Sequence, residues 1–314
     1  MSAGARLLGG DIGGTKTLLR VVEPGGEISA EDRYDSGVHA TLEELVAHFL
    51  EGVSGPVDSA CLAVAGPVYE GEADVTNVGW KVSERELAAR FGFRRTTLIN
   101  DFFAVALGVP LLAVEDLVTI QLGVCDRSAP MAILGAGTGL GEAFIVPAGD
   151  SWNAFATEGG HGDFAPQDEQ QGRLLRHLQA EHGHVSWERV VSGIGLVNIF
   201  TFLGGTAADG GEVAELCEAG DPLAAEAFRI FVDAYGAEAG NMGLRLLARG
   251  GVFLAGGIAA KNLGRFTDGK FLDAFVRKGR FRSLLETMPV HVITNENVGL
   301  LGAVEAAKRA AAMG

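Results

Sequence analysis

Cysteine is scarce in this chain of 314 residues, and the three present, Cys61, Cys125 and Cys217, stand far apart with no Cys-x-x-Cys pair. Sequence neighbours therefore cannot build a disulfide framework or a cysteine zinc site, and this usage fits a reducing cytoplasm. The chain also lacks any run of about 18 apolar residues, and no uninterrupted apolar stretch precedes Asp11. We expect an untargeted soluble protein without a membrane span.

Basic residues are outnumbered, with 25 Lys and Arg against 40 Asp and Glu and a net charge of -15. This balance disfavours binding to nucleic acid or to an anionic membrane surface. Hydrophobic residues make up 47% and charged residues 21%, which excludes general disorder. The length suggests two domains of roughly 150 residues each, but no Pro/Ser-rich linker marks their boundary.

Glycine is abundant, because 46 residues are about twice the ordinary share of roughly 7%. One cluster, Gly10 to Thr15, and another, Gly135 to Gly141, each lie between two strand-like segments. The first is not a Walker A loop, since Lys16 leads into a strand, and the second is not a dinucleotide fingerprint, since Leu140 replaces its third glycine. Either cluster alone is compatible with an ordinary turn. Their matched contexts favour two related halves whose backbones grip one polyphosphate.

Short apolar runs bounded by glycine or proline predict strands at 6–10, 17–22, 61–65 and 96–99. Helical spacing predicts helices at 42–50, 83–91, 102–107, 221–249 and 298–313. Ser83 and Glu86 form a capping-box pattern, and Asp221-Pro222 is a typical helix start. A third glycine turn, Gly256-Gly257, joins a strand to a helical stretch, which suits either a nucleoside or close helix packing. Alternating strands and helices indicate an α/β protein.

The ordered set of these motifs resembles the bacterial glucokinases, within the actin, Hsp70 and sugar-kinase fold. The matches run from residue 7 to about 302. Gly10 to Thr15 resembles the family's first phosphate motif, Ala65-Gly66-Pro67 with 76–80 resembles its sugar-side loop, and Ile99 to Phe102 resembles its catalytic segment. Gly135 to Gly141 resembles the second phosphate motif, Glu158 to His161 with 163–166 resembles the sugar-binding signature, and Leu254 to Ile258 resembles the adenosine motif. Such an ordered set is far more specific than any single motif.

The resemblance implies a two-domain actin-like, ribonuclease H-like ATPase fold with a cleft between the domains. The small α/β domain is expected at 1–110 plus 298–314, and the large one at 111–297. The implied activity is transfer of the γ-phosphoryl group of MgATP to the 6-hydroxyl of D-glucose, and the implied assembly is a cytoplasmic homodimer.

The resemblance also implies roles for individual residues. Asp101 would be the catalytic base, since a carboxylate can orient a sugar hydroxyl and accept its proton. Asp11 would hold Mg²⁺, through water. The expected sugar-binding residues are Asn77, Asn100, Asp101, Glu158, His161 and Glu188. The expected nucleotide-binding residues are Asp11, Gly13, Gly14, Thr15, Lys16, Gly137, Thr138, Gly139, Gly256 and Gly257.

Local chemistry leaves other interpretations open. Asn100 and Asp101 could simply cap the following helix, Glu188 could be a surface charge on a predicted helix, and His161 could be a structural histidine. Lys16 stands where many bacterial glucokinases carry Asn, and Gly-Thr-Lys resembles the neighbouring repressor, open-reading-frame and kinase family. That family holds zinc with a histidine and a cysteine cluster. Because no such cysteines follow His161, we expect no zinc.

Three other functions compete with glucokinase. The first is a kinase for another hexose, such as mannose or an N-acetylated amino sugar. The others are a non-catalytic sugar sensor and a chaperone- or actin-like ATPase. Neither of the last two requires both Asp101 and the Glu158-His161 pair.

Overall fold

The computed structural model describes residues 4–75 and 78–312, whose contacts group into two compact units. Unit 1 comprises Met1–Leu112 and Asn297–Gly314, and unit 2 comprises Ala113–Glu296. Within the described ranges, no helix is long and apolar enough to cross a membrane.

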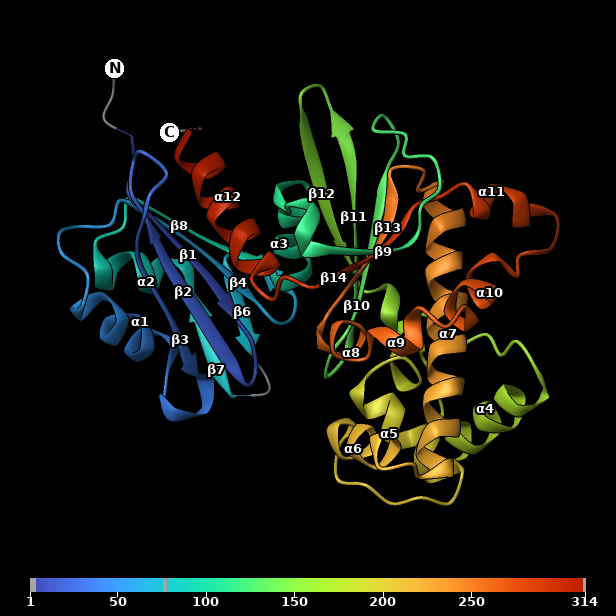
Figure 1. The fold of residues 1–314 in the computed structure, drawn as a ribbon. Helices are drawn as coiled ribbons and strands as arrows, with labels where there is room; N and C mark the ends of the chain where they lie inside the picture. The colour runs from blue at the N-terminus through green and yellow to red at the C-terminus, as the bar shows by residue number, and fades with distance from the viewer. Residues whose placement is uncertain (1–3, 76–77, 313–314) are drawn as a thin grey trace. The chain divides into compact units, whose positions relative to one another are not determined.

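Unit 1 is built on a mixed sheet with the strand order β3-β2-β1-β4-β8 (Figure 1). The first glycine cluster forms the turn of the β1–β2 antiparallel hairpin, and β1 pairs in parallel with β4 on its other side. A small antiparallel sheet, β5-β6-β7, accompanies it. The strands are β1 (Leu7–Ile12), β2 (Lys16–Val22), β3 (Ile28–Asp35), β4 (Ser59–Val64), β5 (Val68–Tyr69), β6 (Glu72–Val75), β7 (Trp80–Ser83) and β8 (Arg95–Asn100).

Side chains of β1 alternate between the two faces of this sheet. Leu8 and Ile12 are buried in a core shared with the helix at 42–51, whereas Leu7 packs against the C-terminal helix α12. A Cβ at Gly9 would lie 2.5 Å from Val304 Cγ2, so the glycine lets α12 lie directly against β1. The helices of unit 1 are α1 (Leu42–Glu51), α2 (Glu84–Phe91), α3 (Asp101–Gly108) and α12 (Val298–Ala312), with the 3-10 turns η1 (Ser36–Val38) and η2 (Val109–Leu111).

Unit 2 repeats the same arrangement. The second glycine cluster forms the turn of the β10–β11 antiparallel hairpin, and β10 pairs in parallel with β13, as β1 does with β4. The predicted relation between the two halves is therefore confirmed in topology. The sheet has the order β12-β11-β10-β13-β14-β9, with β9 (Leu117–Gln121), β10 (Met131–Ala136), β11 (Leu140–Ala148), β12 (Ser151–Thr157), β13 (Gly251–Ala255) and β14 (Val290–Ile293).

Helix α7 (Pro222–Leu246) is the long central helix of unit 2 and packs against α10 (Figure 1). Asp221 Oδ1 accepts from Ala224 N at 2.8 Å, which starts the helix where the Asp-Pro pair predicts. Phe228, Phe231 and Tyr235 are fully buried, as their spacing predicts. The other helices and 3-10 turns are η3 (Val114–Asp116), η4 (Gly159–His161), α4 (Glu169–His182), η5 (Trp187–Arg189), α5 (Gly193–Phe202), α6 (Gly210–Glu218), α8 (Gly257–Lys261), α9 (Leu263–Phe266), α10 (Lys270–Val276), η6 (Gly279–Phe281) and α11 (Arg282–Glu286).

Two local predictions are wrong. Helix α7 ends at Leu246, short of Arg249, because Leu247 takes a left-handed conformation with φ 48°. Ser83 precedes α2, but its side chain makes no capping hydrogen bond with the described residues. Its backbone belongs to the end of β7, where it pairs with Glu72, so the chain enters α2 directly from a strand.

Candidate functional site

The first glycine turn, in unit 1, is stabilised by hydrogen bonds from Ser36. Gly13 N donates to Lys16 O at 2.9 Å, which closes the turn. Ser36 then donates through its hydroxyl to Gly13 O at 2.8 Å and through its N–H to Thr15 O at 3.0 Å. Ser36 is fully buried, so this bracing is protected from water. Nothing in the sequence pattern links Ser36 to a turn more than twenty residues earlier, and sequence reasoning missed it.

Asp11 lies at the end of β1 beside the start of α12. A Cβ at Gly299, in the first turn of that helix, would lie 2.6 Å from Asp11 Oδ2. Burial raises the pKa of Asp11 to about 6, and the nearby positive charge of Lys16 opposes this rise. No group of three or more His, Cys, Asp or Glu side chains in the described part of the chain is arranged to hold a metal. A single carboxylate beside the first glycine turn fits Mg²⁺, because this ion keeps most of its coordinated water molecules and needs few protein ligands.

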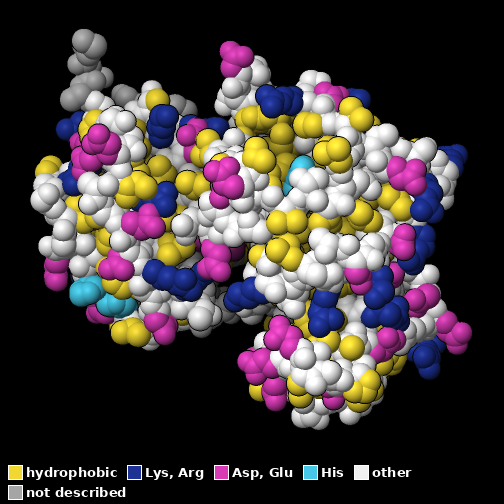
Figure 2. Space-filling model, in the orientation of Figure 1, with side chains coloured by type: hydrophobic (Ala, Val, Ile, Leu, Met, Phe, Trp, Pro, Cys, Tyr) yellow, Lys and Arg dark blue, Asp and Glu magenta, His cyan; other side chains and the backbone are white. Residues whose placement is uncertain are grey.

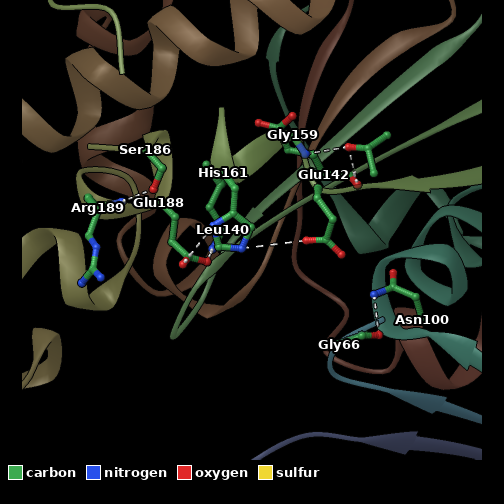
Figure 3. Close-up of polar contacts among 11 residues, drawn as sticks. Gly66, Asn100, Leu140, Glu142, Gly159, His161, Ser186, Glu188 and Arg189 are labelled. Atoms are coloured by element: carbon green, nitrogen blue, oxygen red, sulfur yellow. Dashed lines mark hydrogen bonds and ion pairs between the residues drawn. The ribbon is translucent and has the colours of Figure 1, made fainter. Parts of the chain in front are cut away.

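Asn100 and Asp101 stand where β8 passes into α3. Asn100 Oδ1 accepts from Phe103 N at 3.1 Å and so caps α3, while its amide donates to Gly66 O at 3.1 Å (Figure 3). Asp101 Oδ1 accepts from Phe102 N at 2.9 Å. Asn100 therefore caps α3, and its contact with Gly66 connects this segment to the predicted sugar-side loop. Asn77 lies outside the described residues.

In unit 2, three predicted sugar-binding residues lie together, and Figure 3 labels two of them, His161 and Glu188. His161 Nε2 is 3.9 Å from Glu158 Oε2, and His161 Nδ1 is 3.9 Å from Glu188 Oε1. The side chains of Glu158 and His161 are 65% and 60% exposed, so their polar atoms face outward and can meet a ligand. Two carboxylates thus flank one imidazole, a set that both accepts and donates hydrogen bonds.

Glu188 is fixed by the second glycine turn. Its Oε2 accepts from Leu140 N at 2.9 Å, at the point where the turn enters β11. Glu188 lies on the 3-10 turn η5 rather than on an α-helix, and only 28% of its side chain is exposed. Gly160 approaches the carbonyl of Leu140 so closely that a Cβ there would overlap it. The second glycine turn and the Glu158-His161 turn therefore pack against each other.

A cavity of about 580 Å³ opens beside the second glycine turn, within the size range of small-molecule sites. Gly193 N donates to Gly137 O at 2.8 Å, so the start of α5 rests on the turn. Of the predicted nucleotide residues, Gly137, Thr138 and Gly257 line this cavity. Its other lining residues are Gly193, Ile194, Leu196, Val197, Ala208, Asp209, Gly210, Gly211, Ala214, Glu218, Phe228, Ile258, Lys261 and Asn262.

Several of these lining residues escaped sequence reasoning. The lining glycines Gly193 and Gly210 directly follow the residues that cap α5 and α6, Ser192 and Asp209, and a glycine after a cap is a local signal that backbone approaches closely. Phe228 was expected only as a buried residue, yet it also lines the cavity. The charge of the chain gives no further clue, since Figure 2 shows acidic and basic side chains interspersed on the displayed faces.

Solved structures with the same architecture define the class of protein. A glucokinase from an Antarctic psychrotroph superposes with a TM-score of 0.86 at 31% identity, covering 97% of this chain and 99% of that one. A glucokinase from Balamuthia mandrillaris in complex with glucose gives 0.82 at 23% identity, covering 98% and 95%. The protein is a two-domain α/β protein of the sugar-kinase fold, and the predicted fold class is confirmed.

Sequence comparison narrows this class to one family. The family model described as Glucokinase matches residues 8–310. The glucokinase of Nostoc sp. is 41% identical over 338 aligned positions, covering 96% of this chain and 99% of the relative. The chain belongs to the glucokinase family. The resemblance inferred from the ordered motifs is confirmed.

Proposed function

We propose that the protein transfers the γ-phosphoryl group of MgATP to the 6-hydroxyl of D-glucose, forming glucose 6-phosphate and ADP. The observation that carries this proposal is the placement of His161 between Glu158 and Glu188, 3.9 Å from each, on a turn packed against a glycine turn of phosphate-binding type. Membership of the glucokinase family supports the same activity.

Sugar recognition needs polar groups that match ring hydroxyls in both directions. Glu158 and Glu188 accept hydrogen bonds, and His161 donates from one ring nitrogen and accepts at the other. Glu188 already uses Oε2 on Leu140 N, which leaves Oε1, the atom nearest His161, for a hydroxyl. A sugar that lacks a matching hydroxyl would leave one of these polar groups desolvated and without a hydrogen-bond partner. The three side chains therefore favour sugars with a particular arrangement of ring hydroxyls. Asn77, Asn100 and Asp101 of unit 1 complete the proposed sugar contacts.

The nucleotide is assigned to the glycine turns and the cavity. Small glycine turns let backbone N–H groups approach phosphate oxygens, and apolar side chains such as Phe228 and Ile258 suit the faces of a base. The proposed nucleotide contacts are Asp11, Gly13, Gly14, Thr15, Lys16, Gly137, Thr138, Gly139, Gly256 and Gly257. Mg²⁺, held by Asp11 through water, would neutralise charge that develops on the phosphates.

Asp101 is the proposed catalytic base. Its carboxylate accepts the proton of the 6-hydroxyl as that oxygen forms a bond to the γ-phosphorus, and the bond from the γ-phosphorus to the bridging oxygen breaks to release ADP. The contact from Phe102 N to Oδ1 holds the carboxylate at the start of α3. Such support fixes the orientation of the carboxylate.

The test is Asp101→Asn, with Asp32→Asn on the exposed edge strand β3 as the matched control. We expect Asp101→Asn to retain folding and glucose affinity but to lose about 10²-fold to 10⁴-fold in kcat, the range for a lost general base. The control should keep full turnover. An Asp101→Asn variant that keeps more than about a tenth of its turnover would contradict the assignment.

We also infer a cytoplasmic homodimer. Support for the compartment comes from the three cysteines, all of which are free thiols. Support for the dimer comes from the family resemblance, and light scattering at micromolar concentration checks it.

A further inference from the structure

Glu142, near the start of β11, has a buried carboxyl that the proposed reaction does not use. Glu142 is 1% exposed, and neither of its carboxyl oxygens has a hydrogen-bond partner among the described residues. An ionised carboxylate in such surroundings is costly, so the group favours its uncharged form. Sequence reasoning gives no role to this position.

The turn that contains Gly159 and His161 lies against Glu142 at Gly159 (Figure 3). A Cβ at Gly159 would overlap Glu142 Oε2, so only a glycine lets the turn rest on this carboxyl. Thr157 joins the two segments, because its hydroxyl donates to Glu142 O at 3.2 Å and accepts from Gly159 N at 3.1 Å. The turn is therefore in direct contact with the Glu142 carboxyl, and the volume of that side chain limits where the turn can lie.

The groups facing Glu142 come from the turn and from α7. From the turn, the nearest atoms to Glu142 are those of Gly159, which carries no charge. Helix α7 contributes Glu238 and Arg245, and the phenol of Tyr235 on the same helix is itself affected by Glu142. Burial raises the pKa of Glu142 to about 8, the negative charge of Glu238 adds to this rise, and Arg245 opposes it.

Glu238 differs from Glu142 in having partners. Its Oε1 accepts from Arg245 at 2.6 Å, and its Oε2 accepts from Asn241 at 2.7 Å. Lys278 donates to Asn241 Oδ1 at 2.8 Å, which adds a second cation on that side of α7. The charge of Glu238 is thus stabilised by cations, whereas Glu142 has no hydrogen-bond partner among the described residues and favours its uncharged form.

We propose that Glu142 is a positioning residue for sugar binding: its uncharged carboxyl supports Gly159 and so sets where Glu158 and His161 meet the sugar. The proposal rests on the proposed function, in which Glu158 and His161 bind glucose. When Glu142 releases its proton to water, the new charge must be hydrated, and the turn resting on it is displaced. Glucose binding and protonation of Glu142 then favour each other.

A specific pH dependence follows from this coupling. If the ionised form does not bind, the apparent Kd for glucose doubles near pH 8 and rises about tenfold by pH 9, relative to pH 7. Saturating glucose restores the proton, so kcat is preserved while KM rises. Glu142→Gln, which keeps the size of the side chain and cannot ionise, should bind glucose equally well across this range.

The experiment measures glucose binding by calorimetry between pH 6.5 and 9.5, without nucleotide, for the wild type, Glu142→Gln and Glu238→Gln. We expect Glu142→Gln to abolish the alkaline loss of affinity. Glu238→Gln should retain that loss but shift it to lower pH, because a charge that repels ionised Glu142 is gone. An alkaline loss at unchanged pH in Glu142→Gln would overturn the proposal.

A second measurement needs no variant. Calorimetry of the wild type in buffers of different ionisation enthalpy should detect uptake of about 0.8 proton on glucose binding at pH 8.5 and about 0.1 proton at pH 7. No uptake at pH 8.5, with normal binding, would overturn the role of Glu142 alone. Absence of glucose binding at pH 7 would overturn the proposed function as well.

Discussion

Gly256, at the turn between β13 and α8, provides a sharp test of the nucleotide side of unit 2. Its φ of 84° and ψ of 158° belong to a region that is almost exclusive to glycine. A Cβ at this position would also lie 2.5 Å from the carbonyl oxygen of Ala136, in the neighbouring strand β10. Gly256→Ala therefore combines backbone strain with a clash against backbone that cannot rotate away.

The two costs can be added. Forcing alanine into this conformation costs about 1–3 kcal/mol, and overpacking against a strand costs about 1–3 kcal/mol more. We expect Gly256→Ala to lose about 2–6 kcal/mol of stability, which lowers Tm by at least about 4 °C in a unit of this size. Because Ala136 leads into the Gly137 turn, nucleotide affinity should fall while glucose affinity changes little.

Gly257→Ala is the matched control, one residue away in the same turn. A Cβ there would meet only Lys261, with Cε at 3.8 Å, which is ordinary contact with a flexible side chain. Gly257 begins α8, where alanine is favoured over glycine, so stability should stay within about 0.5 kcal/mol of the wild type. Calorimetric scans of both variants check this. Equal Tm values for the two would refute the reasoning about Gly256.

Three further predictions concern titrating groups and metal. Folding raises the pKa of Glu142 from 4.5 to about 8, so between these pH values the folded protein binds one proton more than the unfolded chain, and stability should fall as pH rises. In urea denaturation, the stability of Glu142→Gln relative to the wild type should increase by about 2 kcal/mol between pH 6 and pH 8. Parallel plots of stability against pH for the two proteins would contradict this. The proposed Mg²⁺ site requires the ionised form of Asp11, whose pKa burial raises to about 6. Activity at limiting Mg²⁺ should therefore fall below about pH 6, and tenfold more Mg²⁺ should move this acidic loss to lower pH. An acidic loss that does not respond to Mg²⁺ would count against Asp11. Chelator-treated enzyme should recover with Mg²⁺ alone, and stoichiometric zinc that is required for activity would contradict the expected absence of zinc.

The elements that sequence predicts well are those whose signal is local. The glycine clusters between apolar runs indicate the β1–β2 and β10–β11 hairpins, and Asp221-Pro222 locates the start of α7. Ser83 shows where such reasoning fails. A capping pattern competes with strand pairing, and the pairing of Ser83 with Glu72 cannot be seen in the local sequence.

The candidate site is predictable in part for the same reason. Glu158 and His161 are three residues apart, so one turn brings them together. Glu188 joins them through contacts between segments far apart in the sequence, such as that of its carboxylate with Leu140, 48 residues earlier, and that of Trp187 N with Gly162 O. Ser36 and Glu142 could not be identified from the sequence, because their roles depend on burial and on neighbours from other elements. A single Ser or Glu in a sequence indicates neither its burial nor its neighbours.

The central claim, phosphorylation of glucose at its 6-hydroxyl, is tested most directly by ADP release measured over a panel of sugars. The panel is glucose, mannose, N-acetylglucosamine and the 2-, 3-, 4- and 6-deoxyglucoses. We predict the highest kcat/KM for glucose and a loss of roughly 5-fold to 150-fold for each missing ring hydroxyl, from about 1–3 kcal/mol per stranded polar group. 6-Deoxyglucose should bind yet release no ADP above the sugar-free background. A higher kcat/KM for mannose or N-acetylglucosamine, or sugar binding without ADP release from any member, would contradict the claim.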